Sequence, residues 1–265
     1  MTDGLREPEL LDATWIPNAL MLSQEAGWNQ NAADWSVFFT HGSVLGFVAG
    51  DRLIATAAAL PYGDALGWVS MVLVTAEWRR QGLATRLVAD CTAVLRDRRR
   101  AALLDAVPGA EGIYAAHGFV SLCEMERWEG LGGGLKAKPA GANLSLDQSA
   151  FGADRRFLLD NFLSRPGSAA FASTHGFAIL RQGSVASHIG PIVSTPEEAP
   201  GLLGEAIRAA SGRVFVDALD HDTLVPVLAA NGFHLQRKFI RMACGLSELP
   251  GCPTKLLAAA GPEFG

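Results

Sequence analysis

Apolar and polar positions in the first half of the chain follow two periods, one helical and one extended. Apolar residues recur every three to four positions over residues 14–25 and 32–40, which predicts two helices. Three apolar runs follow, and the glycine–aspartate pairs between them favour tight hairpin turns. These runs predict an antiparallel meander with strands over residues 44–49, 53–62 and 67–74.

A long helix and a buried strand follow the meander. We expect the helix over residues 82–96, then a strand over 102–106, a short helix over 110–117 and a strand over 120–128. Because a strand, a helix and a strand follow one another, the strand over 102–106 should pair in parallel with the third meander strand through a right-handed crossover.

The second half of the chain repeats this order of elements. Helices are predicted over residues 154–164, 196–210 and 222–231, and strands over 169–173, 177–181, 185–193, 214–217 and 233–243. In each half, an aspartate that ends a buried strand is followed by a short helix and a Gly-Phe pair. The aspartates are Asp105 and Asp217, and the pairs begin at Gly118 and Gly232. We infer that the chain contains a duplication.

Composition supports two folded domains. Of the 265 residues, 49% are hydrophobic and only 18% are charged, so there is enough apolar surface for the chain to fold. A glycine-rich stretch near the middle favours a linker. The predicted division is a first domain over residues 1–129, a linker over 130–144 and a second domain over 145–265. The expected fold class is α/β (α+β), with mixed, mostly antiparallel sheets flanked by helices.

The charge balance and the short apolar runs exclude several classes of protein. With 27 acidic and 22 basic residues the net charge is -5, which argues against a general nucleic-acid binder. The longest apolar stretch, Leu53 to Leu60, is far shorter than the roughly 20 residues that span a bilayer. No signal peptide is visible and the four cysteines form no Cys-x-x-Cys pair, so we expect a cytoplasmic protein. The six histidines lack metal-binding spacing, so we expect no metal.

The sharpest chemical signal is a strand that runs into a tight loop and then into a long helix, over residues 72–85. The first amides of a helix have no partners within it, and the helix dipole adds partial positive charge, so such amides bind a diphosphate. Gly82 and the small Ala84 let the backbone approach an anion, and Arg79 and Arg80 add basic charge. The alternative is an ordinary loop before a helix with a basic start.

A second signal lies at the end of the short helix, where Tyr114 stands four residues before Gly118. Gly118 is expected to end the helix in the left-handed conformation, and Phe119 to lie in the core. Tyr114 itself is either a reactive phenol or simply a half-buried aromatic residue.

Together these residues resemble the GNAT superfamily of acyl-CoA-dependent N-acyltransferases. Its pattern Arg/Gln-x-x-Gly-x-Gly/Ala, after a valine-rich strand, is matched at Arg79, Gly82 and Ala84, and its tyrosine before a Gly-Phe pair at Tyr114. More narrowly, the chain resembles the bacterial tandem group of YitH-like proteins. The segments that carry this narrower resemblance are Ala26 to Gln30, Asp34-Trp35, Leu104 to Ala106, Phe151 to Arg155, Gly190-Pro191 and Arg241-Met242. The resemblance implies two GNAT-like domains in tandem, the second degenerate.

The resemblance also implies a cosubstrate and a mechanism. Acetyl-CoA would lie in the wedge between the strand that ends at Val74 and the strand over 102–106, its pantetheine paired to the backbone like an added strand. A backbone N–H near Val72 would stabilise the oxyanion, and Tyr114 would protonate the leaving thiolate as the general acid. The residues implied in cofactor binding are Val72, Leu73, Val74, Arg79, Arg80, Gln81, Gly82, Leu83, Ala84 and Thr85.

The general base and the acceptor site stay open at this point. Some GNAT proteins have a glutamate on the strand before the loop, but residues 68–71 contain no carboxylate. A water held by the backbone or by Ser70, or the carboxylate of Asp34 or Asp105, is a candidate base.

In GNAT proteins the segment between the first two helices commonly covers the acceptor site. Here that segment contains Trp28, Asn29, Gln30, Asp34 and Trp35. The candidate substrate residues are Trp28, Asn29, Asp34, Trp35 and Ser70. The aromatic rings and the carboxylate would attract an ammonium. The alternative makes both tryptophans core residues and Asp34 a helix cap.

The second half has lost the features of a cofactor site. Glu197 and Glu198 stand where a diphosphate needs positive charge, Pro196 and Pro200 remove amide donors, and Leu228 replaces the tyrosine. We therefore expect one CoA per chain, with the second domain shaping the acceptor pocket or supporting the first.

The predicted activity is transfer of an acetyl group from acetyl-CoA to a primary amine of a small molecule, an amino acid or a peptide N-terminus. The alternative is a non-catalytic acyl-CoA sensor or a protein-interaction module. The expected partners are the amine or peptide substrate, without nucleic acid or membrane, and the chain is expected to be a monomer or a homodimer.

Overall fold

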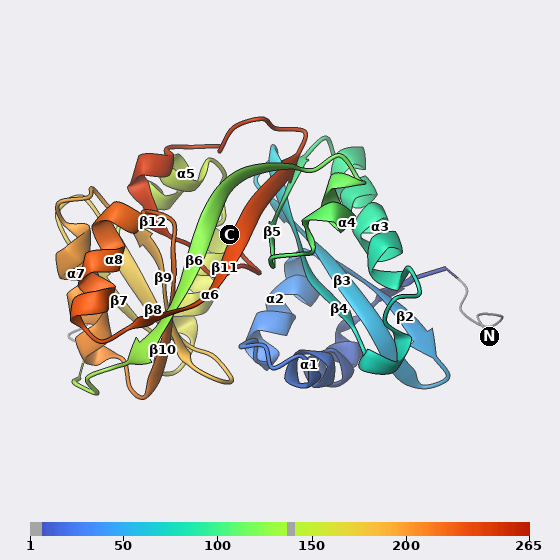
Figure 1. Cartoon of the computed structure of the whole chain (residues 1–265), viewed down its shortest axis with the longest axis horizontal. Helices are drawn as coiled ribbons and strands as arrows, with labels where there is room; N and C mark the ends of the chain where they lie inside the picture. Colours follow the sequence, from blue (N-terminus) through green and yellow to red (C-terminus); the bar gives the residue numbers. More distant parts are fainter. Residues whose placement is uncertain (1–6, 137–140) are drawn as a thin grey trace. The chain divides into compact units, whose positions relative to one another are not determined.

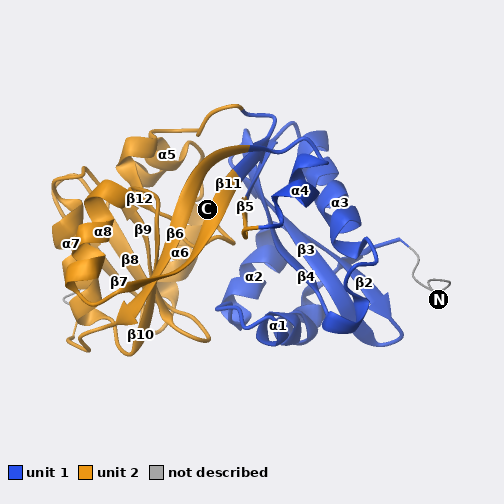
Figure 2. Cartoon of the chain, viewed as in Figure 1, with its two compact units in different colours: residues 1–104, 109–120, 242–246 blue, residues 105–108, 121–241, 247–265 orange. Residues whose placement is uncertain are grey.

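The computed structural model describes residues 7–136 and 141–265 of the chain. The folded chain divides into two compact units (Figure 2). Unit 1 contains residues 1–104, 109–120 and 242–246, and unit 2 contains residues 105–108, 121–241 and 247–265. Each unit combines sheet strands with helices. The expected fold class, α/β with mixed and mostly antiparallel strands flanked by helices, is confirmed.

Unit 1 is built on the predicted meander. Strands β2 (Ser43–Ala49), β3 (Arg52–Tyr62) and β4 (Leu66–Val74) pair antiparallel through two short turns. The sequence did not predict β1 (Glu9–Leu11), which pairs antiparallel with β2. Buried and exposed residues do not alternate along β3 and β4, because both faces of each strand are buried.

Three helices pack on this meander. Helices α1 (Ile16–Glu25) and α2 (Ala32–His41) pack on each other and on β3, and α3 (Leu83–Asp97) packs on β2, β3 and β4 (Figure 1). The contact of α3 with β4 is so close that a Cβ on Gly67 would overlap the side chain of Leu95. A side chain at this crossing would therefore force Leu95 to move.

Strand β5 (Ala101–Ala106) pairs with β4 in parallel, as the crossover predicts. Only three register pairs join them, between Leu66, Gly67 and Trp68 of β4 and the first three residues of β5. The rest of β4, which includes the candidate cosubstrate residues, therefore separates from β5. The short helix α4 (Glu111–Ala115) follows β5.

Unit 2 repeats the order of elements of unit 1. Its strands are hydrogen-bonded in the order β11-β6-β10-β12-β9-β8-β7. The strands are β6 (Val120–Leu131), β7 (Ala169–Ala172), β8 (Phe177–Gln182), β9 (Ser187–Val193), β10 (Arg213–Ala218), β11 (His234–Cys244) and β12 (Leu256–Ala258). The helices are α5 (Ser145–Phe151), α6 (Arg156–Ser164), α7 (Ala199–Ala209) and α8 (His221–Ala230). Short 3-10 turns span Ala13–Trp15, Ala76–Trp78 and Pro253–Lys255.

The last strand of each repeat contributes to the other unit. Strand β6 ends the first repeat, yet it pairs antiparallel with β10 of the second repeat, and all but its first residue belongs to unit 2. Strand β11 ends the second repeat, yet residues 242–246 belong to unit 1. The two compact units therefore differ from the two sequence repeats, and the division of the chain into domains over 1–129 and 145–265 stays a prediction.

The glycine-rich segment after β6 is held by backbone hydrogen bonds to unit 2. The amides of Gly132 and Gly133 donate to the carbonyls of Gly212 and Ile207 at 2.8 and 2.9 Å. The start of the predicted linker over 130–144 is thus hydrogen-bonded to the backbone of unit 2, and its glycines allow this close backbone contact. Residues 137–140 of that linker lie outside the described residues.

Candidate active site

The predicted diphosphate loop connects β4 to α3 in unit 1. Gly82 precedes the helix with φ +83°, and no side chain of the described residues caps the first turn. Arg80 also has a positive φ of 61°. These two left-handed positions turn the chain so that the first amides of α3 have no capping partner, which is what an anion site at a helix start requires. The residues of the predicted cosubstrate loop are thus brought together.

Two side chains hold the loop in this shape. The Glu25 carboxylate at the end of α1 accepts hydrogen bonds from the amide of Ala76 at 2.8 Å and from the hydroxyl of Thr75. Because of the Ala76 amide, the pKa of Glu25 is lowered and the group stays ionised. Arg79 donates through Nε to the carbonyl of Val74 at 3.0 Å. Glu25 was not predicted as a site residue, since nothing in a helical pattern marks a side chain that reaches a distant loop.

Strand β4 carries an irregularity just before the loop. Its pairing with β3 shifts by one residue, because Ala58 pairs with Ser70 whereas Thr56 pairs with Leu73. Met71 in this bulge has φ +54°, and its carbonyl accepts a hydrogen bond from the hydroxyl of Thr56 at 2.9 Å. A bulge takes backbone groups out of the ladder. The backbone at Val72 therefore leaves the regular pairing with β3. The predicted oxyanion contact is a backbone N–H near this residue.

Ser70 lies directly before this bulge. Its side chain is only 7% exposed, and its hydroxyl has no hydrogen-bond partner among residues 7–136 and 141–265. A buried hydroxyl is normally paired, so this one requires a water or a ligand. Of the candidate substrate residues, Ser70 is the one whose polar atom is left available.

Tyr114 lies on α4 and is half-buried. Burial raises the pKa of its phenol, so the group is protonated at neutral pH. Its ring packs edge-on against Phe119, with centroids 6.2 Å apart, and its carbonyl accepts the amide of Phe119 at 3.2 Å. Gly118 ends the helix with φ +83°, as predicted.

The predicted acceptor residues divide into two groups. Trp35 is fully buried and donates through Nε1 to Ser23 Oγ at 3.0 Å, so it is a core residue, and its predicted substrate contact is corrected. Asp34 is fully buried and closes a capping box with Asn31, each accepting the other's amide at 3.0 Å. Asp34 is therefore a structural cap rather than a free base.

Trp28 and Asn29 form the second group. Trp28 is half-buried, and its amide donates to the carbonyl of Ser23 at 2.9 Å. Asn29 is only 6% exposed. Their predicted substrate contacts stay predictions.

Asp105 is engaged in an ion pair. Both of its carboxylate oxygens accept hydrogen bonds from Arg241, at 2.8 and 2.9 Å, and both side chains are buried. The predicted role of Asp105 as a candidate general base is therefore corrected.

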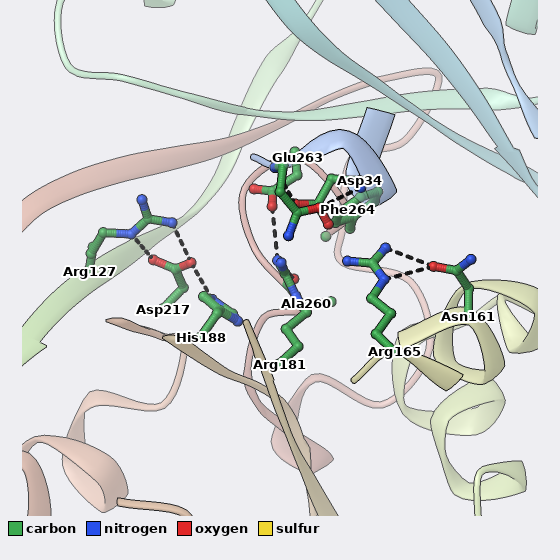
Figure 3. Close-up of polar contacts among 12 residues, drawn as sticks. Asp34, Arg127, Asn161, Arg165, Arg181, His188, Asp217, Ala260, Glu263 and Phe264 are labelled. Atoms are coloured by element: carbon green, nitrogen blue, oxygen red, sulfur yellow. Dashed lines mark hydrogen bonds and ion pairs between the residues drawn. The ribbon is translucent and has the colours of Figure 1, made fainter. Parts of the chain in front are cut away.

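The second repeat contains the same kind of pair. Asp217 accepts two hydrogen bonds from Arg127 at 2.8 Å and a third from His188 Nε2 at 2.9 Å (Figure 3). Burial opposes ionisation of Asp217, but Arg127 and His188 together hold the pKa of its carboxyl well below the usual range. The sequence predicted the aspartates as a repeat but not their arginine partners.

Comparisons with known proteins now identify the two repeats. A family model described as "Acetyltransferase (GNAT) family" matches residues 9–119, and one described as "Acetyltransferase (GNAT) domain" matches residues 144–258. The chain belongs to the GNAT superfamily. It contains two GNAT domains in tandem, as the sequence predicts. The class of reaction that this membership supports is acyl transfer.

Solved structures share the fold at low sequence identity. A candidate acetyltransferase from Pyrococcus horikoshii is 17% identical with a TM-score of 0.84, over 99% of this chain and 96% of that one. A GNAT protein from Sphaerobacter thermophilus is 16% identical with a TM-score of 0.63, over 89% of this chain and 94% of that one. A tandem GNAT protein from the clavulanic acid biosynthesis pathway is 15% identical with a TM-score of 0.60, over 90% and 98%. A comparison with curated proteins gives no match.

Two features are absent from the described residues. No helix within the described ranges is long and apolar enough to cross a membrane. In the same part of the chain, no group of three or more His, Cys, Asp or Glu side chains could hold a metal ion.

Proposed function

We propose that the chain is an N-acetyltransferase that transfers the acetyl group of acetyl-CoA to a primary amine, at a single site in unit 1. The observation that carries the proposal is the way β4 separates from β5 after three register pairs and then runs into a helix start without a side-chain cap. This arrangement provides backbone for an extended ligand and amides for its diphosphate in one continuous path.

The residues along this path fit the parts of acetyl-CoA. Val72 and Val74 lie beyond the last register pair with β5, so β5 does not occupy the edge of β4 at which their backbone would pair with the amides of pantetheine. The amides from Arg80 to Thr85 and the positive end of α3 suit a diphosphate. Arg79 would exchange its bond to the Val74 carbonyl for one to the ligand.

The reaction needs an oxyanion contact, a proton acceptor and a proton donor. The nitrogen of the amine attacks the thioester carbon, and a backbone N–H of the β4 bulge stabilises the oxygen that becomes negative. The carbon–sulfur bond then breaks, and Tyr114 gives its proton to the sulfur and regains one from solvent. A water hydrogen-bonded to Ser70 takes the proton of the amine. Ser70 is the residue of β4 best suited to hold such a water, because its buried hydroxyl has no partner in the described chain.

The acceptor is a primary amine of a small molecule, an amino acid or a peptide N-terminus. The test is release of thiol from acetyl-CoA in the presence of a panel of these three classes, with the acetylated amine identified by mass spectrometry. We expect amine-dependent thiol release that the Gly82→Glu variant lacks. If CoA binds but no amine in the panel releases thiol, the chain is instead a non-catalytic acyl-CoA sensor.

A further inference from the structure

Unit 2 has a wedge equivalent to that of unit 1. Strands β9 and β10 pair in parallel at three positions and then separate, as β4 and β5 do. The antiparallel pairing of β9 with β8 also shifts its register, between Ile189 and Ile192 of β9. The duplicated aspartates align the two repeats. His188 pairs with the residue two positions before Asp217, just as Trp68 pairs with the residue two positions before Asp105. Gly190 therefore corresponds to Ser70.

The wedge of unit 2 is filled by the chain itself. Strand β12 pairs antiparallel with β9 through Leu256 and Ala258, and with β10 through Ala258. The amide of Ala259 donates to the carbonyl of Asp217 at 2.9 Å, and the carbonyl of Leu257 accepts the amide of Leu219 at 2.8 Å. All side chains of residues 256–260 are buried. The segment thus pairs with the separated strand ends as an added strand would.

Gly190 shows that this position is adapted to the segment. A Cβ on Gly190 would overlap the carbonyl oxygen of Ala259. The corresponding residue of unit 1, Ser70, carries a side chain whose hydroxyl has no partner in the described residues. A glycine is needed where the segment passes, whereas in unit 1 no part of the described chain pairs with Ser70 Oγ.

Buried charges hold the continuation of the segment in place. Arg181 donates to the carbonyl of Ala260 at 3.0 Å and pairs with Glu263 at 2.9 Å (Figure 3). Arg155 donates to the carbonyl of Phe264 at 3.3 Å and pairs with Asp147 at 2.8 Å. All four charged side chains are buried, so residues 260–264 are fixed within unit 2.

We propose that residues 256–260 are the resident occupant of the unit 2 wedge, where they take the place that the pantetheine arm of acyl-CoA takes in unit 1. Assigning the unit 1 wedge to pantetheine rests on the proposed function. The segment closes the second GNAT domain to acyl-CoA and replaces a ligand by a permanent strand. Glu198 lies at the start of α7, where its carboxylate accepts hydrogen bonds from His175. The negative charge of this carboxylate further disfavours a diphosphate at the start of α7.

Hydrogen exchange of the full chain, with and without CoA, tests this proposal. The amides of residues 256–260 should exchange as slowly as those of β9, and CoA should slow exchange over residues 72–85 without changing residues 187–193. If residues 256–260 exchange as fast as an unstructured peptide, or if CoA protects residues 187–193, the proposal is overturned. If CoA fails to protect residues 72–85, the proposed function fails instead, and the glycine variants decide the role of the segment.

Two glycine variants provide the matched comparison. Gly190→Ala should make the amides of residues 256–260 exchange at least tenfold faster, because the new Cβ displaces the Ala259 carbonyl. Gly201→Ala is the control, since a Cβ there meets open space on α7. Unchanged exchange of residues 256–260 in Gly190→Ala would overturn the proposal. If Gly190→Ala does not fold, the exchange of these residues in the unmodified chain gives the answer by itself.

Discussion

Arg127 and Asp217 are register partners on adjacent antiparallel strands, and their side chains are joined by two hydrogen bonds of 2.8 Å. Arg127 stands eight residues after Phe119, and Arg241 stands eight residues after Phe233. Each arginine therefore occupies the same place in its repeat, and each pairs with the aspartate of the other repeat. All four side chains belong to unit 2, so the two repeats contribute equally to this pair of buried ion pairs.

The Arg127–Asp217 pair should respond strongly to loss of one partner. Arg127→Met leaves a buried carboxylate without its cation, which costs about 3–5 kcal/mol of the free energy of unfolding. The double variant Arg127→Met with Asp217→Asn should recover part of this loss, because the uncompensated charge is gone. Urea denaturation gives both values. The control is Arg156→Met, whose exposed pair with Asp160 is worth at most about 0.5 kcal/mol.

A comparable loss in both arginine variants would mean that the methionine side chain, and not the buried charge, determines the stability. No recovery in the double variant would show that the hydrogen bonds to Asp217 matter more than its charge.

His188 should make unfolding depend on pH. Burial lowers the pKa of its imidazole below 6.5, so the folded chain keeps it neutral while the unfolded chain takes up a proton as the pH falls. Stability is therefore lost below about pH 6.5, by up to about 1.4 kcal/mol per pH unit, until the pH reaches the folded pKa. The His188→Gln variant should show a shallower decline between pH 6.5 and 5 in denaturation experiments. Equal slopes in both proteins would contradict a neutral buried imidazole.

The packed glycine segment after β6 should not tolerate side chains. A Cβ on Gly132 would overlap the carbonyl of Ala210, and overpacking of this kind costs about 1–3 kcal/mol. Gly132→Ala should lower the free energy of unfolding by that amount. Gly141→Ala is the matched control, because a Cβ there meets nothing within 4 Å. If both substitutions are neutral, the segment is the flexible linker that its composition suggests.

The sequence predicted the long elements and missed the short ones. Helix α3 and the meander have enough residues to show a period, whereas β1 and β12 have three residues each and show none. The sequence also does not predict the seven-residue α5, which lies next to the glycine-rich stretch whose composition indicates a linker.

Within the site, local motifs were predictable and long-range partners were not. The loop around Gly82 and the turn at Gly118 depend on neighbouring residues, and both have the positive φ that their glycines favour. The pairing of Asp105 with Arg241 joins residues 136 positions apart. Trp35 lies on α2, and the apolar pattern of this helix does not show whether a given residue is buried in the core or lines a binding site. Such contacts are set by the fold as a whole.

Gly82 provides the test of the diphosphate loop. CoA at 100 times its dissociation constant should stabilise the folded chain by about 2.7 kcal/mol, seen as a higher melting temperature. Gly82→Glu should abolish this shift, because a carboxylate would repel the diphosphate. Gly82→Ala is the control for the strain of a side chain at φ +83°, and it should keep most of the shift. If Gly82→Glu retains the full shift, the loop does not bind the diphosphate.

Tyr114→Phe tests the proton donor. The substitution removes only the hydroxyl, so the packing against Phe119 and the affinity for CoA should be unchanged. General acid catalysis is worth roughly 10²–10⁴-fold, so turnover should fall by about tenfold or more. Because burial raises the pKa of Tyr114, the unmodified protein should keep its activity up to the ordinary tyrosine pKa of about 10 before deprotonation removes the acid. Single-turnover rates across this pH range separate chemistry from product release. Equal single-turnover rates in the two proteins would make Tyr114 a packing residue, and a water would then have to protonate the thiolate.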